Sequence, residues 1–489
     1  IHFAESISVL NEAVNRLKFD EHFFLQLLMA VRKSSIQQTG TKALIKIGPQ
    51  VKLISDSLDF ELTSAQKKVI KEIKNDMARP FSMNRLLQGD VGSGKTIVST
   101  LVAAIAVANS VQVAVMAPTE ILAQQHYDSF KIYAEMARMT CAILIGGTPA
   151  KERKSILDGL ASGRIDIIIG THALIQEDVA FKELGLAIVD EQHRFGVLQR
   201  GDLTRKGFNP HLLAMTATPI PRTLAITYHG DMDLSIIDEM PKDRIPIITK
   251  VVEETRLEKI YTFMKEEVKA GRQCMVVYPL VKETEKSDLA AAVEMHGELS
   301  ENIFPELKVG LIHGRMKNDD KGEVMDAYAR NEIHILVSTT VIEVGIDIPN
   351  ATVMLIEYAD RFGLTQLHQL RGRVGRGSEK SYCILVRRNF TENSKKRLRI
   401  MESTNDGFVI SDEDLKLRGP GEFFGIRQSG FLKYKIANMI TDGPILRKAR
   451  QSAFELVKSD PNLNQPENEL IRTRFMNEYQ DKLDRANIS

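Results

Sequence analysis

Residues 89–96 read Gly89-Asp90-Val91-Gly92-Ser93-Gly94-Lys95-Thr96, which matches the pattern G-x-x-x-x-G-K-[ST] at every fixed position. Residues 84–88 before it suit the end of a strand, and the apolar residues 96–109 after it suit a long helix. Glycines in such a loop let backbone N–H groups turn toward phosphate oxygens, and the helix N-terminus adds partial positive charge. The sequence therefore predicts a phosphate-binding loop in an α/β domain. The alternative is a glycine-rich turn without a ligand.

A phosphate-binding loop of this kind needs a cation, a hydroxyl and an acidic partner. Lys95 is expected to bridge the β- and γ-phosphates, and the Thr96 hydroxyl to hold Mg²⁺. An apolar run ends at Asp190 and Glu191, and ligands of open parallel sheets sit beyond the carboxyl ends of strands. Asp190 would hold Mg²⁺, usually through water, while Glu191 orients and deprotonates the attacking water. His193 is a candidate coupler of nucleotide state to another site, although a lone histidine is more often structural.

Short apolar runs rich in Val and Ile alternate with longer amphipathic stretches from about residue 60 onward. Such runs suit strands that are buried on both faces, as in parallel sheets covered by helices. They are Val111–Met116, Ile165–Ile169, Leu186–Val189, Leu212–Met215, Cys274–Tyr278, Ile333–Val337, Thr352–Ile356 and Tyr382–Val386. A polar stretch near Asp238–Pro246 separates the first four from the last four. The fold class is therefore α/β, with two parallel-sheet domains joined there, a helical linker or brace before them and a helical, polar region after about residue 400.

The composition excludes several classes of protein. Hydrophobic residues make up 43% of the 489 and charged residues 26%, which is ordinary for a globular protein of two to four domains. Lys and Arg number 65 against 64 Asp and Glu, which excludes a histone-like polycation but not a basic channel for nucleic acid. The longest apolar run is too short for a membrane span. Three scattered cysteines and no signal-peptide pattern favour the cytoplasm, and because the chain begins at Ile1 we expect that the front of a longer protein is missing.

A second basic motif lies in the later half of the chain. Residues 369–377 carry three arginines among glycines, Arg371, Arg373 and Arg376, whose spacing suits the delivery of guanidinium groups to a phosphoryl group, as arginine fingers. Alone, the motif is as readily a basic surface loop.

Taken in order, these motifs resemble those of the superfamily 2 helicases. The matching segments are Thr63–Gln66 (adenine-reading, through Gln66, with Phe60 as a stacking partner), Gly89–Thr96, Ala117–Glu120 (with Thr119), Gly170–His172 (with Thr171), Asp190–His193, Thr216–Pro219, Ser338–Asp347 (with Thr340, Gly345 and Asp347) and Gln369–Arg376 (with Arg373 and Arg376 as its arginine fingers). The resemblance implies two RecA-like domains that bind ATP and Mg²⁺ between them. It also implies that Thr119, Thr171, His172, Thr340 and Gln369 contact DNA or couple it to the nucleotide.

Finer matches resemble the RecG-type branch-migration helicases of bacteria. They include residues 190–200, Thr216–Leu224, Ile312–Met316 and Asp414–Gly430. The last is similar to that family's translocation (TRG) motif, a helical hairpin in which Arg397, Arg418 and Gln428 would be coupling residues. The implied domains are a linker or brace (1–50), the ATP-binding RecA-like domain (51–240), the second RecA-like domain (241–395) and the TRG domain (396–489). The family's strand-splitting wedge domain has no counterpart in residues 1–50, which puts unwinding in question.

The resemblance implies an ATP-dependent translocase on duplex DNA that reverses forks and migrates Holliday junctions in bacterial recombination and repair. It would act as a monomer near the nucleoid, with single-strand-binding or replication-fork proteins as further partners. Residues 381–450 carry 14 Lys and Arg against 8 Asp and Glu, which favours duplex phosphates. The nearest rival is the motor of a transcription-repair coupling factor, whose second motif usually has Glu where Gln192 stands. A nucleotide-switched scaffold that does not move and an RNA helicase are the other rivals.

Overall fold

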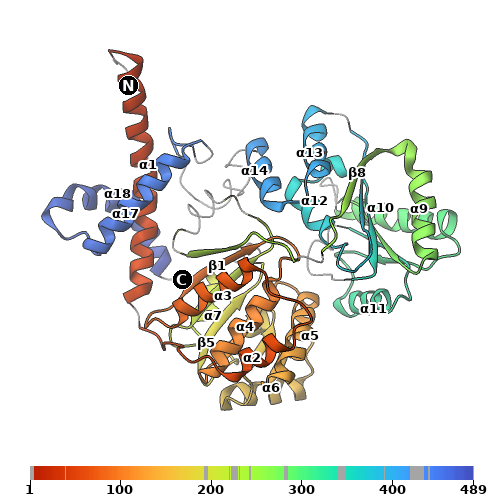
Figure 1. Ribbon diagram of the computed structural model, residues 1–489, viewed down its shortest axis with the longest axis horizontal. Helices are drawn as coiled ribbons and strands as arrows, with labels where there is room; N and C mark the ends of the chain where they lie inside the picture. The colour runs from red at the N-terminus through yellow and green to blue at the C-terminus, as the bar shows by residue number, and fades with distance from the viewer. Residues whose placement is uncertain are drawn as a thin grey trace.

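The computed structural model describes residues 5–38, 40–191, 197–219, 221, 230, 232–241, 244–279, 285–339, 348–389, 391–418, 434–438 and 441–487. Two α/β bodies lie side by side, and a helical assembly formed by both ends of the chain stands beside the first of them (Figure 1). None of the described helices is both long and apolar enough to cross a lipid bilayer.

The first body, or lobe 1, is built on a seven-stranded parallel sheet with the order β3-β4-β2-β5-β6-β1-β7. Its strands are β1 (Asn84–Gly89), β2 (Gln112–Met116), β3 (Cys141–Leu144), β4 (Ile167–Gly170), β5 (Leu184–Val189), β6 (His211–Thr216) and β7 (Asp233–Ile237). The central strands are buried along their whole length because helices cover both faces of the sheet.

Among the helices of lobe 1, α4 (Lys95–Ala108) lies at the centre of one face of the sheet, and every residue from Ile97 to Ala106 is buried. The others are α2 (Pro49–Asp56), α3 (Ser64–Met77), α5 (Glu120–Met136), α6 (Ala150–Ser162) and α7 (Val197–Thr204), with a 3₁₀ turn at His172–Ile175. The predicted strand–loop–helix setting of the phosphate-binding loop is therefore present as β1, loop and α4.

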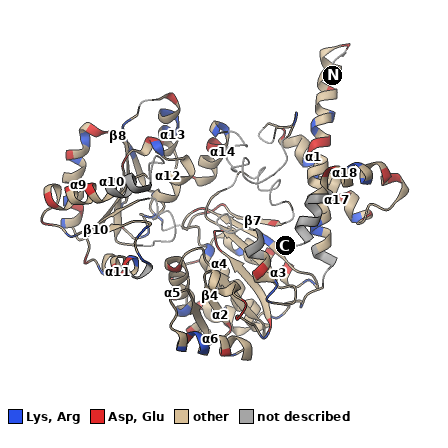
Figure 2. Ribbon diagram, turned by 180° about the vertical axis from the view of Figure 1, so that it is seen from behind, with Lys and Arg blue, Asp and Glu red and all other residues tan. Residues whose placement is uncertain are grey.

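The second body, or lobe 2, has a six-stranded parallel sheet with the order β10-β11-β9-β12-β13-β8. Its strands are β8 (Ile248–Glu253), β9 (Gln273–Val277), β10 (Val309–Ile312), β11 (Ile335–Ser338), β12 (Ala351–Ile356) and β13 (Tyr382–Arg387). Its helices are α9 (Leu257–Lys269), α10 (Glu285–Glu298), α11 (Asn318–Ala329) and α12 (Leu364–Arg371), with short turns at Glu254–Arg256, Leu299–Ile303 and Ala359–Arg361. Lys and Arg alternate with Asp and Glu along outer helices such as α9 and α6 (Figure 2).

The helical ends of the chain pack against each other. Helix α1 (Ile7–Gln38) buries Leu27 and Leu28 against α17 (Gly443–Ser459) and α18 (Glu469–Asn487). Lys33, near the end of α1, lies 2.5 Å from Asp233 of β7, so α1 connects the C-terminal helices to lobe 1. The helical structure predicted for the N-terminal region is confirmed. Two more helices, α13 (Glu392–Ser403) and α14 (Gly407–Arg418), lie between lobe 2 and this assembly (Figure 1). A 3₁₀ turn at Pro466–Asn468 connects α17 to α18.

Candidate nucleotide site between the two sheets

The phosphate-binding loop joins β1 to α4 and is wound around its own lysine. Gly92 and Gly94 have φ angles of 77° and 86°, a left-handed conformation that glycine adopts at no steric cost. The Lys95 ammonium donates to the carbonyl oxygen of Gly89 at 2.8 Å and to that of Asp90 at 2.9 Å. Phosphate oxygens are stronger acceptors than these neutral carbonyls. When a triphosphate is bound, the Lys95 ammonium would therefore donate to the phosphate oxygens instead.

Asp190 follows β5 at the carboxyl edge of the sheet, close enough for its charge to act on Lys95. Its Oδ2 lies 2.8 Å from Nε2 of His126, a buried residue of α5, and its Oδ1 accepts the Glu191 N–H at 2.9 Å. Burial alone would raise the pKa of Asp190, but the His126 hydrogen bond and the Lys95 charge outweigh it and lower that pKa. His126 belongs to none of the sequence motifs and was missed by the sequence analysis.

Glu191 has a different electrostatic setting. Burial and the neighbouring Asp190 charge raise the pKa of Glu191, against the charges of Lys95 and Arg373. Its φ of 50° is uncommon for a residue other than glycine, and backbone strain of this kind clusters at functional sites. Two adjacent carboxyl groups whose pKa values are pushed apart can divide the work between a charged metal-holding carboxylate and a general base.

Two arginines approach these groups from lobe 2. Arg373 is buried, and its charge acts on the general-base candidate. The charge of Arg376 acts on Lys95. A Cβ built on Gly372 would lie 2.7 Å from the side chain of Val91 in the phosphate-binding loop. The arginine loop therefore lies against lobe 1 rather than on an outer surface, which is the position that arginine fingers require.

The predicted adenine-reading residues are arranged around the same loop. Gln66 is buried; its Oε1 accepts the Thr63 N–H at 2.9 Å and its Nε2 donates to the carbonyl oxygen of Ser93 at 2.8 Å. In this structure Gln66 thus caps α3 and supports the phosphate-binding loop, and its contact with adenine stays a prediction. Phe60 is 39% exposed on the segment before α3, which leaves its ring available for stacking.

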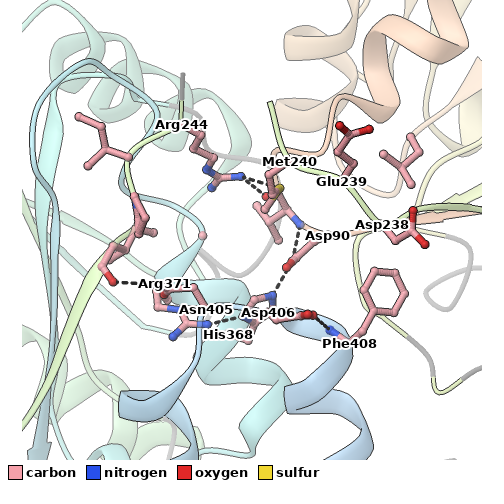
Figure 3. Close-up of a pocket in the computed structure, with 16 residues that line it drawn as sticks. Asp90, Asp238, Glu239, Met240, Arg244, His368, Arg371, Asn405, Asp406 and Phe408 are labelled. Atoms are coloured by element: carbon pink, nitrogen blue, oxygen red, sulfur yellow. Dashed lines mark hydrogen bonds and ion pairs between the residues drawn. The ribbon is translucent and has the colours of Figure 1, made fainter. Parts of the chain in front are cut away.

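A cavity of about 280 Å³ opens beside the loop, between the two lobes. Figure 3 shows Arg244, on the connection from β7 to β8, pointing across it toward Met240 and the phosphate-binding loop. A guanidinium N–H of Arg244 donates to the carbonyl oxygen of Val91. The sequence predicts this connection only as the junction of the two domains; no local motif singles out Arg244, because its position follows from the packing of the connection.

Arg397 and Arg418, the two described residues that were predicted as coupling residues, hold the beginning of α12, the helix that leads into the arginine loop. Arg397 of α13 donates to the carbonyl oxygens of Phe362 at 2.8 Å and Asp360 at 2.7 Å. Arg418 of α14 donates to Asp414 Oδ1 at 2.8 Å, and its guanidinium lies against Gly363, the residue that caps α12. Helix α12 is thus held at its N-terminus by the C-terminal region and presents the arginines at its other end.

Of the predicted DNA-contact or coupling residues that are described, Thr119, Thr171 and His172 lie at one edge of lobe 1, whereas Gln369 lies in lobe 2. Thr119 and Thr171 follow the neighbouring strands β2 and β4; Thr119 caps α5 by accepting the Leu122 N–H at 3.3 Å. The Thr171 hydroxyl is buried without a hydrogen-bond partner among the described residues, whereas His172 is exposed. Gln369 is buried in α12. His193, Thr340, Gly345, Asp347 and Gln428 lie outside the described residues.

No group of three or more His, Cys, Asp or Glu side chains in the described ranges is arranged to hold a metal ion. A magnesium ion at this site would therefore draw its oxygen ligands from a hydroxyl, a carboxylate, water and the phosphates. Thr96, in the first turn of α4, and the charged Asp190 supply oxygen donors of these types. These residues fit the metal that phosphoryl transfer needs.

Three families of known proteins match successive parts of the chain. Residues 63–226 match the DEAD/DEAH box helicases, residues 255–378 match the helicase conserved C-terminal domain, and residues 404–489 match domain 3, C-terminal, of the ATP-dependent DNA helicase RecG. The ATP-dependent DNA helicase RecG of Bacillus subtilis is 48% identical over 478 residues, which is 97% of this chain and 70% of the relative. The chain belongs to the RecG family. Membership favours RecG over the transcription-repair coupling factor among the predicted alternatives.

The chain spans only part of the length of its RecG relatives. The ATP-dependent DNA helicase RecG of Synechocystis is 48% identical over 464 residues, which is 95% of this chain and 56% of that protein. A structure described as RecG bound to a three-way DNA junction is 44% identical with a TM-score of 0.75, and the match covers 91% of this chain and 58% of that one. A structure of the helicase MrfA bound to DNA, at 17% identity and a TM-score of 0.56, shows the shared fold alone. The two RecA-like sheets are confirmed as the fold.

Proposed function

We propose that this chain is the motor of a RecG-type enzyme, which hydrolyses ATP and uses the energy to move along duplex DNA. The observation that carries the proposal is that charged groups of both lobes meet at one phosphate-binding loop. Lys95 and Glu191 come from lobe 1, while Arg373 and Arg376 come from lobe 2, and their charges act on one another. A site divided in this way links the chemistry of the nucleotide to the relative position of the lobes.

The residues divide the work of phosphoryl transfer. Lys95 and the loop N–H groups bind the β- and γ-phosphates, and Glu191 orients the attacking water and accepts its proton. Arg373 and Arg376 stabilise the charge that develops on the γ-phosphate oxygens. Thr96 and Asp190 would hold Mg²⁺, which neutralises phosphate charge when bound.

The connection between the lobes and the C-terminal helices convert this chemistry into movement. When the arginines of lobe 2 lose the γ-phosphate, the lobes separate about the connection near residues 238–246, a hinge-type change. Because Arg397 and Arg418 hold the start of α12, the C-terminal helices follow that helix. We divide the chain accordingly at residues 50, 240 and 395 into brace, two RecA-like domains and TRG domain.

The DNA-binding part of the proposal rests on the predicted contact residues and on the relative bound to a three-way junction. The half-buried Thr119 hydroxyl and the exposed His172 imidazole suit phosphate oxygens rather than base edges, as would the hydroxyl of the undescribed Thr340, whereas the buried Thr171 hydroxyl could contact DNA only after a local rearrangement. Binding would then be sequence-independent and would weaken steeply with salt. We propose forks and Holliday junctions as substrates, single-strand-binding or replication-fork proteins as partners, a monomeric state, and a place beside the bacterial nucleoid, because the relatives are bacterial.

A triplex-displacement assay tests the proposal. A third strand bound to duplex DNA is removed only by a protein that moves along the duplex, so ATP-dependent displacement is expected from the wild-type chain and not from Glu191→Gln. Displacement that fails while ATP hydrolysis persists would support the rival scaffold that switches without moving. Stimulation of hydrolysis by duplex RNA but not duplex DNA would support the RNA helicase instead.

A further inference from the structure

The side chain of Asp90 connects the phosphate-binding loop to two distant parts of the chain. Its Oδ1 lies 2.5 Å from Nε2 of His368 in α12, and its Oδ2 accepts the N–H of Gly407, the first residue of α14, at 2.9 Å. Figure 3 shows Asp90 and His368 pointing toward each other below the cavity. The G-x-x-x-x-G-K-[ST] pattern does not specify the residue at position 90, so phosphate binding alone does not require an aspartate there.

The hydrogen bonds fix the tautomer of His368. Its Nδ1 lies 2.9 Å from a guanidinium nitrogen of Arg371. Arginine is only a donor, so Nδ1 must accept, and the ring proton therefore sits on Nε2 and is donated to Asp90. The three side chains thus form a directed chain of hydrogen bonds rather than a chance contact.

The chain of hydrogen bonds continues to the end of α13. Arg371 is 1% exposed, and its other guanidinium nitrogen donates to the carbonyl oxygens of Met401 at 2.9 Å and Thr404 at 2.8 Å. Arg371 is therefore not a third arginine finger, despite its place in the arginine loop. It is a buried cross-link between α12 and the α13–α14 junction, and it is held to the phosphate loop through His368.

We propose that Asp90, His368 and Arg371, here named the Asp90 relay, are positioning residues that transmit the nucleotide state of the phosphate-binding loop to α13 and α14. The inference rests on the proposed function. It adds a second connection between the nucleotide site and the C-terminal helices, one that does not involve the arginine fingers. Lys95 donates to the carbonyl oxygen of Asp90, and phosphate would remove that bond. The relay's hydrogen bonds are buried and directional, so a change at the Asp90 backbone alters the bond that its side chain makes to His368 or to Gly407.

The relay is separate from the contacts of Arg397 and Arg418. Those arginines hold the N-terminal end of α12, through Asp360, Phe362 and Gly363. The relay instead joins the C-terminal half of α12 and the first residue of α14 directly to the loop that binds phosphate. Its loss should therefore uncouple hydrolysis from movement without removing any group that contacts ATP.

Substitutions of His368 test the relay. We expect His368→Ala to change the Kd of ATP by less than about threefold, because no ATP-binding group is removed, and to raise the ATP consumed per triplex displaced by about tenfold, which is usual for coupling between two sites. In His368→Gln the amide N–H takes the place of Nε2 and keeps the bond to Asp90, so this variant is expected to recover most of the coupling. In His368→Asn the amide oxygen takes the place of Nδ1 and keeps only the Arg371 bond, so this variant should resemble Ala.

A glycine substitution tests the same junction without changing a polar side chain. A Cβ added to Gly407 would lie 2.5 Å from Nε2 of His368 and 2.7 Å from Oδ2 of Asp90. Gly407→Ala should therefore separate the two and raise the ATP-to-displacement ratio as His368→Ala does. The matched control is Gly322→Ala in α11, where no atom lies within 4 Å of the added Cβ; its ratio should equal that of the wild-type chain.

The outcomes are distinguishable from a failure of the proposed function. If the wild-type chain neither hydrolyses ATP nor displaces the triplex, the motor proposal itself is wrong. If the wild-type chain does both, the relay is refuted when His368→Ala and Gly407→Ala keep the wild-type ratio of ATP to displacement. It is also refuted when hydrolysis and displacement fall in parallel in both, since that pattern indicates a purely structural role.

Discussion

Replacing Arg376 by alanine should abolish turnover and leave the nucleotide bound. The charge of Arg376 acts on Lys95 across the lobe boundary, and a finger arginine is worth about 10³–10⁵ in kcat at related phosphoryl-transfer sites. That factor corresponds to about 4–7 kcal/mol of transition-state stabilisation at 1.36 kcal/mol per tenfold change. Within the chain, the charged Arg376 Nε donates to the Gly372 carbonyl oxygen at 3.3 Å, and a bond of this charge-assisted kind is worth about 1.5–3 kcal/mol, less than the transition-state effect. The loss should therefore fall on kcat rather than on folding.

Steady-state ATP hydrolysis with saturating duplex DNA measures this effect. We expect the KM for ATP to change by less than about fivefold, because Lys95 and the loop N–H groups hold the ground-state phosphates. Arg376→Lys should recover only part of kcat, since an ammonium lacks the planar fork of a guanidinium. Arg330→Ala is the matched control: Arg330 is an exposed arginine of lobe 2 paired with Glu332 at 2.7 Å, and its loss should leave kcat unchanged. A kcat for Arg376→Ala within tenfold of wild type would refute the finger assignment.

Three further predictions follow from individual side chains. Burial and the Asp190 charge raise the pKa of Glu191, and a general base acts only when it is deprotonated. The value of kcat should therefore still rise with pH above the range in which ordinary carboxyl groups titrate. A kcat that is already constant above about pH 5 would contradict this. His126→Ala removes the partner that helps to lower the Asp190 pKa, so the Mg²⁺ concentration for half-maximal hydrolysis should rise about tenfold. An unchanged dependence of hydrolysis on Mg²⁺ concentration would show that His126 does not support the metal-holding carboxylate. Arg85→Met removes the guanidinium that bonds the buried Asp76 at 2.5 Å and 3.0 Å and leaves that carboxylate with the more exposed Arg79 at 3.2 Å, so the free energy of unfolding in urea should fall by about 1–3 kcal/mol. A loss below about 0.5 kcal/mol would show that Arg79 compensates in full.

The central strands of both sheets could be predicted from the sequence. All eight apolar runs coincide with described strands, from β2 (Gln112–Met116) to β13 (Tyr382–Arg387). A central parallel strand is covered on both faces, so nearly every residue must be apolar and the run stands out. The long apolar helix after the phosphate-binding loop was equally visible, because α4 is buried all round.

The edge strands could not be predicted in the same way. Four strands had no predicted apolar run: β3 and β7 are the two edge strands of the first sheet, and β8 and β10 are those of the second. The end of the remaining strand, β1, was expected before the phosphate-binding loop. Strand β8 alternates between exposed and covered positions, and β3 and β10 are only partly covered. An edge strand in these sheets has fewer neighbours, so its sequence is less apolar and resembles a surface loop.

Some residues of the candidate site could be predicted from the sequence, and others could not. Residues that belong to a local phosphate-binding pattern, such as Lys95 and Asp190, were found because the chemistry fixes their spacing along the chain. His126, Arg244 and His368 were missed because tertiary packing, rather than sequence spacing, brings them to the loop. Arg371 was placed in the arginine motif correctly, but only the structure shows that it faces α13 instead of the phosphates.

The central claim is that ATP turnover at Lys95 is tied to a DNA duplex. The rate of ATP hydrolysis by this chain, measured with and without a three-way DNA junction and beside Lys95→Ala, tests that claim directly. We predict that the junction raises the wild-type rate and that Lys95→Ala is inactive in both conditions. An equal wild-type rate with and without DNA, or hydrolysis that survives Lys95→Ala, would contradict the claim.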